Sequence, residues 1–300
     1  ATGVVCDDEL SPAQLRNLED ALDTKVMDRT MVILDIFASR ATTSEGKIQV
    51  ELAQLKYRAA RLVGLRSSLS RLGGGIGTRG PGEKKLEMDR RLIHERISQL
   101  KSELEEVKRH RDVIRKQREK AHTPVAAIVG YTNAGKSTLL NRLTDAGILA
   151  EDKLFATLDP TTRNLELESG QQIMLTDTVG FIRKLPHHLI EAFKSTLEEA
   201  KYSDIILHVV DCSNPNMDMQ MHVVYETLRE LKVEDKIIVT VFNKIDQKED
   251  GEFPRDLQSD YQVQISAKTG AGVPELLDTL EQILRSQKVY LERVFSYQEA

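Results

Sequence analysis

The sequence has few cysteines, no long apolar run and no excess of basic charge. Only Cys6 and Cys212 occur in 300 residues, so a disulfide framework is excluded and a reducing, cytoplasmic compartment is the simplest expectation. No stretch reaches the roughly 20 apolar residues that a membrane-spanning helix needs. The net charge of −5 argues against a uniformly basic nucleic-acid-binding protein, but it is compatible with a local basic patch.

Residues 1–45 are expected to form part of a small N-terminal α/β piece. A strand-like run at 4–6 is followed by Ser11 and Pro12, a pair that is typical of a helix start. A further apolar run lies near 31–37. A piece of this size is too small to stabilise a core alone, so we expect it either to pack on another part of the protein or to be cut short.

Residues 46–121 carry two apolar stripes that step by threes and fours, which predicts two long helices with a coiled-coil-like seam. Each stripe has one charged interruption, at Arg66 and at Arg111. Between them, residues 73–82 contain six glycines and a proline and cannot continue a helix. We therefore predict an antiparallel helical hairpin with its tip at 73–82, and two separate helices are the alternative. The stripes contain Ile48, Leu52, Leu55, Ala59, Leu62, Leu69, Ile93, Ile97, Leu100, Leu104, Val107 and Ile114.

From residue 122 the hydrophobic period changes, and buried strand-like runs alternate with helical patterns. Such alternation is typical of an α/β domain with a mostly parallel sheet and helices on both faces. Alternating leucine and isoleucine residues on either side of Ser169 and Gly170 predict one antiparallel hairpin at an edge. The domain is expected to span 122–288, with a truncated C-terminal segment beginning at 289–300. The strand-like runs are 125–129, 205–210 and 237–242, and the helical patterns are 136–145, 188–200, 217–231 and 274–285.

A phosphate-loop motif, G-x-x-x-x-G-K-[ST], lies at 130–137 between a strand and a helix. Its glycines let backbone N–H groups surround a β-phosphate, and the helix N-terminus adds positive potential. Lys136 can neutralise β and γ oxygens, and Ser137 can offer magnesium a hydroxyl. The motif alone indicates only a nucleoside triphosphate, and a glycine turn without a ligand is the alternative. The predicted nucleotide contacts here are Gly130, Tyr131, Thr132, Asn133, Ala134, Gly135, Lys136, Ser137 and Thr138.

Two further segments are candidate switches that would sense the γ-phosphate. Asp177 ends a strand and can hold magnesium through water, while the N–H of Gly180 can meet the γ-phosphate. The candidate first switch lies upstream at 155–161. Thr157 is one candidate magnesium ligand there, and Thr161 and the adjacent Thr162 are the alternatives. Loss of the γ-phosphate would release both segments. The switch contacts are Phe155, Ala156, Thr157, Leu158, Asp159, Asp177, Thr178, Val179 and Gly180.

An N-x-x-D motif of the form Asn-Lys-Ile-Asp follows the strand at 237–242 and is expected to select the base. The Asp246 carboxylate can accept hydrogen bonds from guanine N1–H and the exocyclic amine. Adenine would leave that carboxylate unpaired, at a cost of about 1–3 kcal/mol. Together with the phosphate loop and the switch, this motif predicts an α/β P-loop GTPase domain. The base-binding residues are Asn243, Lys244, Ile245, Asp246, Ser266, Ala267 and Lys268.

Two positions bear on the rate of hydrolysis. Phe181 stands where many GTPases have a glutamine that orients the attacking water. We therefore expect slow intrinsic hydrolysis, stimulation by a partner, and no certain catalytic side chain. Asn133 occupies a loop position that helps to bind potassium in related GTPases, and a simple turn residue is the equal alternative.

These motifs resemble the HflX family of ribosome-associated GTPases over nearly the whole chain. The most specific segments are 10–14, 28–38, 46–55, 80–83, 130–137, 155–161 and 177–183. The resemblance implies that Thr157 is the switch magnesium ligand and that a hydrophobic residue replaces glutamine, as at Phe181. It also implies binding to the large ribosomal subunit, with the hairpin tip near the peptidyl transferase centre, and splitting or rescue of stalled or idle ribosomes. The chain would then start part-way into the family's N-terminal domain.

The residues themselves give weaker evidence for RNA. Segment 66–91 has seven basic and three acidic side chains, a net charge of +4, which suits phosphate-directed binding, but solvated helix ends explain the charge equally well. A GTPase for ribosome assembly or RNA modification, and a regulatory GTPase whose coiled coil binds a protein, are the alternatives. We expect a monomer that binds GTP and GDP. The candidate RNA-binding residues are Arg66, Arg71, Arg79, Lys84, Lys85, Arg90 and Arg91.

Overall fold

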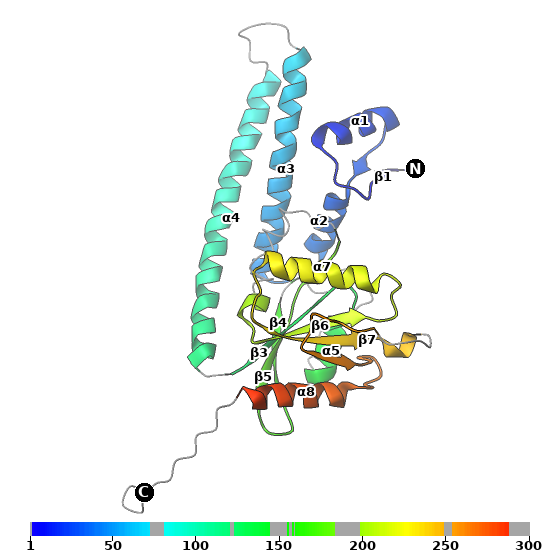
Figure 1. The fold of residues 1–300 in the computed structure, drawn as a ribbon. Helices are drawn as coiled ribbons and strands as arrows, with labels where there is room; N and C mark the ends of the chain where they lie inside the picture. Colours follow the sequence, from blue (N-terminus) through cyan, green and yellow to red (C-terminus); the bar gives the residue numbers. More distant parts are fainter. Residues whose placement is uncertain are drawn as a thin grey trace, which may run out of the picture.

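A computed structural model shows an N-terminal piece, a pair of long helices and an α/β domain (Figure 1). The helical pair projects away from the α/β domain, and the N-terminal piece lies alongside the first of the two long helices. The backbone alone is described at 63–72, 81–86, 114, 115 and 117–120. The structure describes residues 2–72, 81–120, 123–144, 155, 158, 160–183, 199–248 and 254–287.

The N-terminal piece contains two short parallel strands and two helices. Strand β1 (Val4–Val5) pairs with β2 (Val26–Met27), which is too short to be predicted from its pattern. Helix α1 (Pro12–Leu22) begins where the sequence predicts, with Ser11 and Gln14 in a capping box. Helix α2 (Arg29–Arg40) contains the apolar run near 31–37 and is capped by Asp28.

The carboxylate of Asp28 fastens this piece to the helical pair. It is fully buried and accepts hydrogen bonds from the Tyr57 hydroxyl and from Arg61 Nη2, each at 2.6 Å. The backbone N–H of Leu10 also donates to it at 3.2 Å. A buried carboxylate with several donors is stable only while they stay in place, so the piece packs on its neighbour, as its small size predicts.

Helices α3 (Ser44–Leu72) and α4 (Pro81–Lys120) run antiparallel side by side (Figure 1). Their seam buries Leu52, Ile97 and Leu100 and includes Ile48, Leu55, Ala59, Ile93 and Leu104. One prediction needs correction: residues 81 and 82 were assigned to the tip but form the start of α4. Proline fits the first turn of a helix, because the backbone N–H that it lacks would have no partner within the helix there. The rest of the predicted tip, 73–80, lies outside the described residues.

The interruption of the apolar stripe at Arg111 is explained by ion pairs at the base of the hairpin. Its Nη2 lies 2.5 Å from a carboxylate oxygen of Glu45 at the start of α3. Its Nη1 lies 3.8 Å from Glu199, which belongs to the α/β domain. Arg111 therefore connects both helices of the hairpin with the domain beneath them.

The α/β domain has a six-stranded sheet in the order β4-β5-β3-β6-β7-β8. Only β4 is antiparallel, and it lies at the edge paired with β5, as predicted. The other neighbours are parallel, which confirms the predicted fold class. The strands are β3 (Val125–Gly130), β4 (Thr161–Glu166), β5 (Gln172–Asp177), β6 (Ile205–Asp211), β7 (Ile237–Asn243) and β8 (Tyr261–Gln264).

Helices cover both faces of this sheet (Figure 1). Alternate residues of β3 face opposite sides: Ala126 and Ile128 pack with α5 (Lys136–Thr144) and α8 (Val273–Ser286). Ala127 and Val129 pack with α7 (Met217–Glu230), α2 and α3.

Two predicted segments fall largely outside the described residues. Of the helical pattern at 188–200 only 199 and 200 are described, within a helical stretch that runs to 202, and the run at 289–300 is not described. Among the helices that the structure does describe, none has the length and apolarity to cross a membrane.

A buried polar cluster lies between the sheet and α7. The carboxylate of Asp256 accepts hydrogen bonds from the Tyr225 hydroxyl at 2.5 Å and the Thr240 hydroxyl at 2.6 Å. His208 Nδ1 lies 4.0 Å from the same carboxylate, and its ring meets Tyr225 edge to face. Burial lowers the pKa of His208 to about 4, although Asp256 partly opposes the shift.

Replacement of His208 by methionine should make the fold less sensitive to acid. The unfolded chain binds a proton at this histidine near pH 6.5 whereas the folded chain does so near pH 4, so acidification between these values favours unfolding. Between pH 7 and 4.5 the variant should lose about 2–3 kcal/mol less free energy of unfolding, measured by urea unfolding. The control variant His222→Met, on an exposed face of α7, should lose as much free energy of unfolding on acidification as the unaltered protein. If His208→Met lost that amount too, the lowered pKa assigned to His208 would be contradicted.

Candidate functional site

The predicted phosphate loop connects β3 to α5 and is shaped by residues with unusual backbone angles. Gly135 has a φ of 97°, and a Cβ there would lie 2.2 Å from Asn243 Nδ2, so only glycine fits. Asn133 has a φ of 63°, which asparagine tolerates better than most residues. This angle gives the turn interpretation a physical basis, and potassium binding at Asn133 stays a prediction.

Lys136 lies at the start of α5 with its side chain over the loop. It is only 6% exposed, and its ammonium donates a hydrogen bond to the Tyr131 carbonyl at 2.9 Å. Burial lowers the pKa of Lys136 to about 8, while the nearby Asp177 carboxylate favours the charged form. An anion bound at this loop would favour the charged form further.

Ser137 and Asp177 bring two buried oxygen groups together at the end of the sheet. The Ser137 hydroxyl donates to Asp177 Oδ2 at 2.7 Å, and both residues are buried. A hydroxyl and a carboxylate beside a phosphate-binding loop are the oxygen ligands that magnesium prefers. These residues therefore fit a magnesium site. Thr157, Ala156 and Asp159 lie outside the described residues.

The segment after Asp177 is held directly against the phosphate loop. Thr132 N–H donates to the Phe181 carbonyl at 2.7 Å, and Phe181 N–H donates to the Gly130 carbonyl at 3.1 Å. A Cβ on Gly180 would lie 2.8 Å from Thr132 Cα and 3.0 Å from Lys136 Nζ. A glycine is therefore required here, because any side chain would clash with the phosphate loop and approach Lys136, the lysine that is predicted to meet a γ-phosphate.

The side chain of Phe181 points into the protein core. It is 2% exposed and belongs to the same apolar cluster as Phe155, Val179 and Phe37. A buried phenyl ring cannot orient a water molecule as a glutamine does, so this position contributes packing to the site.

Asn243 connects the phosphate loop to the predicted base-binding loops. Its Nδ2 donates to the Ala134 carbonyl at 2.8 Å, and its Oδ1 accepts from Ala267 N–H at 2.9 Å. Asp246, by contrast, is exposed. The carboxyl ends of β3, β5 and β7 thus bring the predicted motifs to one edge of the sheet, where α/β proteins bind ligands.

Two residues that support this edge were missed by sequence reasoning. Asp211 at the end of β6 pairs with Lys244 at 2.7 Å, which holds a lysine whose φ of 66° is left-handed. Arg142 on α5 donates to the carbonyls of Ala267 and Lys268. Neither belongs to a motif, although a charged residue ending a buried strand was a usable signal for Asp211.

The candidate RNA-binding residues lie on both helices of the hairpin toward its tip. Arg66 and Arg71 are in α3, and Lys84, Lys85, Arg90 and Arg91 are in α4, while Arg79 lies outside the described residues. Arg90 and Arg91 are exposed. Their placement is compatible with contact to phosphate, which stays a prediction.

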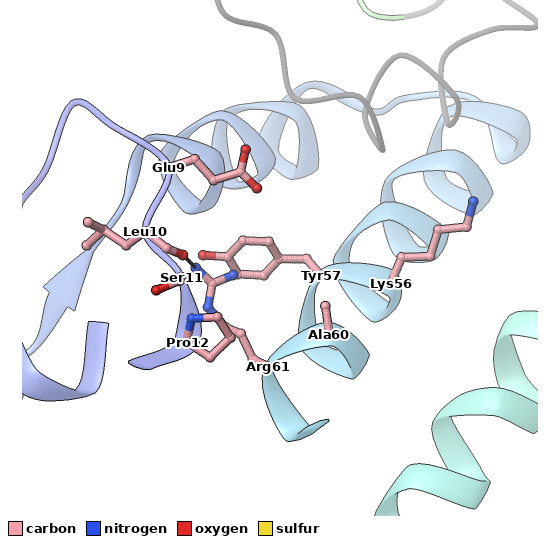
Figure 2. A pocket seen from close by; sticks show the side chains of 8 residues that line it. All are labelled: Glu9, Leu10, Ser11, Pro12, Lys56, Tyr57, Ala60 and Arg61. Atoms are coloured by element: carbon pink, nitrogen blue, oxygen red, sulfur yellow. Dashed lines mark hydrogen bonds between the residues drawn. The ribbon is translucent and has the colours of Figure 1, made fainter. Parts of the chain in front are cut away.

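A separate cavity of about 390 Å³ lies where the N-terminal piece meets α3 (Figure 2). The Arg61 guanidinium stacks on the Tyr57 ring at 3.4 Å, and both side chains bond to the carboxylate of Asp28. Arg61 also donates to the Leu10 carbonyl. These groups are engaged with the protein itself, so their evident role is to join the two parts of the chain.

Family models match the chain in three consecutive parts. Residues 1–38 match the GTP-binding GTPase N-terminal model and 40–118 match the GTP-binding GTPase middle region. Residues 125–244 match the 50S ribosome-binding GTPase model.

Curated relatives and solved structures agree with these matches. The chain is 83% identical to GTPase HflX of Lacrimispora saccharolytica, covering 100% of this chain and 71% of that protein. It is 49% identical to GTPase HflX of Escherichia coli, over 96% of this chain and 68% of the relative. A GTP-binding protein of Sulfolobus solfataricus, solved in complex with GDP, superposes with a TM-score of 0.55 at 28% identity, covering 96% of this chain and 82% of its own.

The lowered pKa of Lys136 predicts that nucleotide binding weakens in mild alkali. Bound phosphate should hold the ammonium charged, whereas the free protein loses its proton near pH 8. The dissociation constant for GDP should therefore rise about fourfold between pH 7.0 and 8.5, measured by isothermal titration calorimetry. If the Lys136→Met variant still binds GDP, its dissociation constant should not rise over this pH range. Equal affinities of the unaltered protein at the two pH values would contradict the lowered pKa.

Proposed function

This chain belongs to the HflX family of GTPases, and we propose that it acts on the large ribosomal subunit to separate or rescue stalled or idle ribosomes. The relatives and the family models confirm the resemblance inferred from the motifs, and the protein is a GTP-hydrolysing enzyme. The observation that carries the ribosomal proposal is a long hairpin, basic near its tip and joined at its base to the nucleotide domain. We place its action in the cytoplasm, as a monomer.

The nucleotide chemistry follows from the residues at the edge of the sheet. Backbone N–H groups of 130–137 hold the β-phosphate, and Lys136 neutralises β and γ oxygens. Ser137 and, through water, Asp177 would hold a magnesium ion, which would balance charge on the phosphates, and the resemblance adds Thr157 as a ligand. The N–H of Gly180 meets the γ-phosphate, and Asp246 reads guanine.

Hydrolysis is expected to be slow until a partner assists it. Phe181 is buried against the core and leaves the attacking water without the usual glutamine. A slow intrinsic rate keeps the GTP-bound form in place long enough for the protein to dock. Stimulation by the ribosome then ends the bound state.

The hairpin supplies the reach that such a function needs. Helix α4 has 40 residues, which corresponds to a length of about 60 Å. Ion pairs between α3 and α4, such as that of Glu51 with Arg96 at 2.7 Å, and the apolar seam stiffen this arm. Basic residues near its end provide salt-dependent attraction to RNA phosphate.

Binding of a protein partner by the same hairpin is a second candidate function. Met88 and Leu92 lie one turn apart on α4 and are 64% and 56% exposed, and exposed apolar side chains at this spacing suit a protein contact. Binding to ribosomes that weakens steeply with salt would favour the RNA-directed role, whereas salt-insensitive binding to a protein would favour this alternative. A role in ribosome assembly or RNA modification shares the salt dependence but requires binding to precursor particles.

Replacement of Asp246 by asparagine should change the preferred base. The carboxylate accepts from guanine, whereas an amide can donate to the additional carbonyl oxygen of xanthine. The dissociation constant for GTP should rise by at least about tenfold and that for xanthosine triphosphate should fall, as measured by fluorescence competition. If ATP competes as well as GTP with the unaltered protein, guanine selection by this loop is wrong.

Neutralisation of the hairpin tip should uncouple hydrolysis from the ribosome. With Arg79, Lys84 and Lys85 changed to glutamine, intrinsic GTP hydrolysis should stay constant while ribosome-stimulated hydrolysis and subunit separation fall. The logarithm of the ribosome-binding constant falls with the logarithm of the salt concentration, and the steepness of this fall should decrease by about 1 for each lost phosphate contact.

The matched control removes the same charge farther along α4, at the exposed Lys101, Lys108 and Arg109. Those changes should leave stimulation near that of the unaltered protein. Equal losses in both triple variants would mean that general charge, and not the tip, mediates the interaction.

A further inference from the structure

We propose that Asp211 at the end of β6 is a positioning residue for guanine selection, because it holds Lys244 in the backbone conformation that places Asp246 for contact with the base. The inference rests on the proposed reading of guanine by 243–246. It goes beyond that proposal because Asp211 lies outside the phosphate loop, the switches and the base-binding loops. It is independent of any action on ribosomes.

The side chain of Asp211 reaches the loop that follows the neighbouring strand. Strands β6 and β7 are parallel, and their last residues, Asp211 and Asn243, lie opposite each other in register. Asp211 Oδ2 accepts a hydrogen bond from the Lys244 ammonium at 2.7 Å. The two side chains are only 13% and 21% exposed, so solvent and salt screen this ion pair less than they screen a pair on the open surface.

Ser213 fixes the carboxylate of Asp211 from the other side. Asp211 Oδ1 accepts hydrogen bonds from the Ser213 backbone N–H at 3.1 Å and from the Ser213 hydroxyl at 2.6 Å. One carboxylate oxygen is thus engaged within its own loop, and the other is left to pair with Lys244. An acceptor that is already oriented loses little freedom when the ammonium binds it, so Asp211 is suited to act as an anchor.

The residue that this anchor holds has a strained backbone. Lys244 has a φ of 66°, a left-handed conformation that residues with a side chain keep only where their surroundings enforce it. Lys244 immediately precedes the short 3₁₀ turn Ile245–Gln247, which carries the exposed Asp246. A change of φ at Lys244 would redirect the chain at Asp246, two residues later. The ion pair with Asp211 opposes that change.

The neighbouring base-binding loop is held by different contacts. Arg142 donates to the carbonyls of Ala267 and Lys268, and Ala267 N–H donates to Asn243 Oδ1 at 2.9 Å. These contacts do not pass through Asp211. Loss of the Asp211 ion pair should therefore disturb the turn at 245–247 and leave the other loop and the phosphate loop in place.

The consequence is a change in selection between two purines. Guanine differs from hypoxanthine only by the exocyclic amine, which is one of the two groups from which Asp246 is expected to accept hydrogen bonds. GDP and inosine diphosphate carry the same ribose and phosphates, so the ratio of their dissociation constants reports the contact with the amine alone. If Asp211 served only to stabilise the fold, its loss would weaken both nucleotides equally.

The test uses Asp211→Asn in the full chain, with binding of both diphosphates measured by isothermal titration calorimetry. The amide keeps the shape of the side chain and can still accept from Ser213, but it lacks the charge that holds Lys244. The dissociation constant for GDP should rise about fivefold, and that for inosine diphosphate should rise less than about twofold.

The matched control is Asp204→Asn at the opposite end of the same strand. Asp204 immediately precedes β6, and its carboxylate accepts from Val125 N–H at 2.8 Å, far along the sheet from the base-binding loops. This variant should change neither dissociation constant. Urea unfolding without nucleotide checks that each variant folds. If Asp211→Asn does not fold, Ser213→Ala, which frees the carboxylate, should show a smaller loss of the same selectivity.

A double variant tests whether Asp211 acts through Lys244. In the Lys244→Met background, which lacks the ammonium, Asp211→Asn should cause no further weakening of GDP binding. Additive losses, or an unchanged ratio of the two dissociation constants in Asp211→Asn, would overturn the inference while guanine recognition by 243–246 still stands. Binding of ADP to the unaltered protein as tightly as GDP would overturn both.

Discussion

A single apolar cluster joins the switch residues Phe155 and Phe181 to helices α2 and α3 and to the central strands of the sheet. Close-packed cores change between discrete arrangements and do not deform continuously. A switch segment that left this cluster would expose its own phenyl ring and leave Phe37 without its edge contact. We therefore expect nucleotide state and the position of the N-terminal helices to be coupled by packing, without a dedicated linker.

Phe181, which stands where many GTPases have a glutamine, contributes to this coupling through its packing. A glutamine there would orient water, but its polar amide would be costly to bury among apolar side chains. The phenyl ring instead anchors the second switch, while its backbone pairs with Gly130 and Thr132. The base of the hairpin is attached independently, through Arg111 to Glu199. Two attachments of different chemistry thus connect the nucleotide edge with the arm that we propose for the ribosome.

The sequence predicts what is local or periodic, and the structure adds what is distant. The phosphate loop, the edge hairpin and the two long helices follow from short motifs and repeated apolar spacing. The bond from Arg29 to the Arg183 carbonyl joins residues 154 positions apart, and no pattern in the sequence indicates it. Likewise Asn243 carries the guanine motif, but its bridge from Ala134 to Ala267 requires the folded sheet. The end of the hairpin tip was misplaced because Pro81 is as compatible with a first helical turn as with a loop.

Hydrogen exchange of the backbone amides in the two nucleotide states tests this coupling most directly. With a non-hydrolysable GTP analogue, the amides of α2 and of the buried part of α3 near Val50 and Ala53 should exchange more slowly than with GDP, because closed switches complete the shared cluster. The amides of α8, which packs on the opposite face of the sheet, should exchange equally in both states. Identical exchange of α2 and α3 with the two nucleotides would contradict the account.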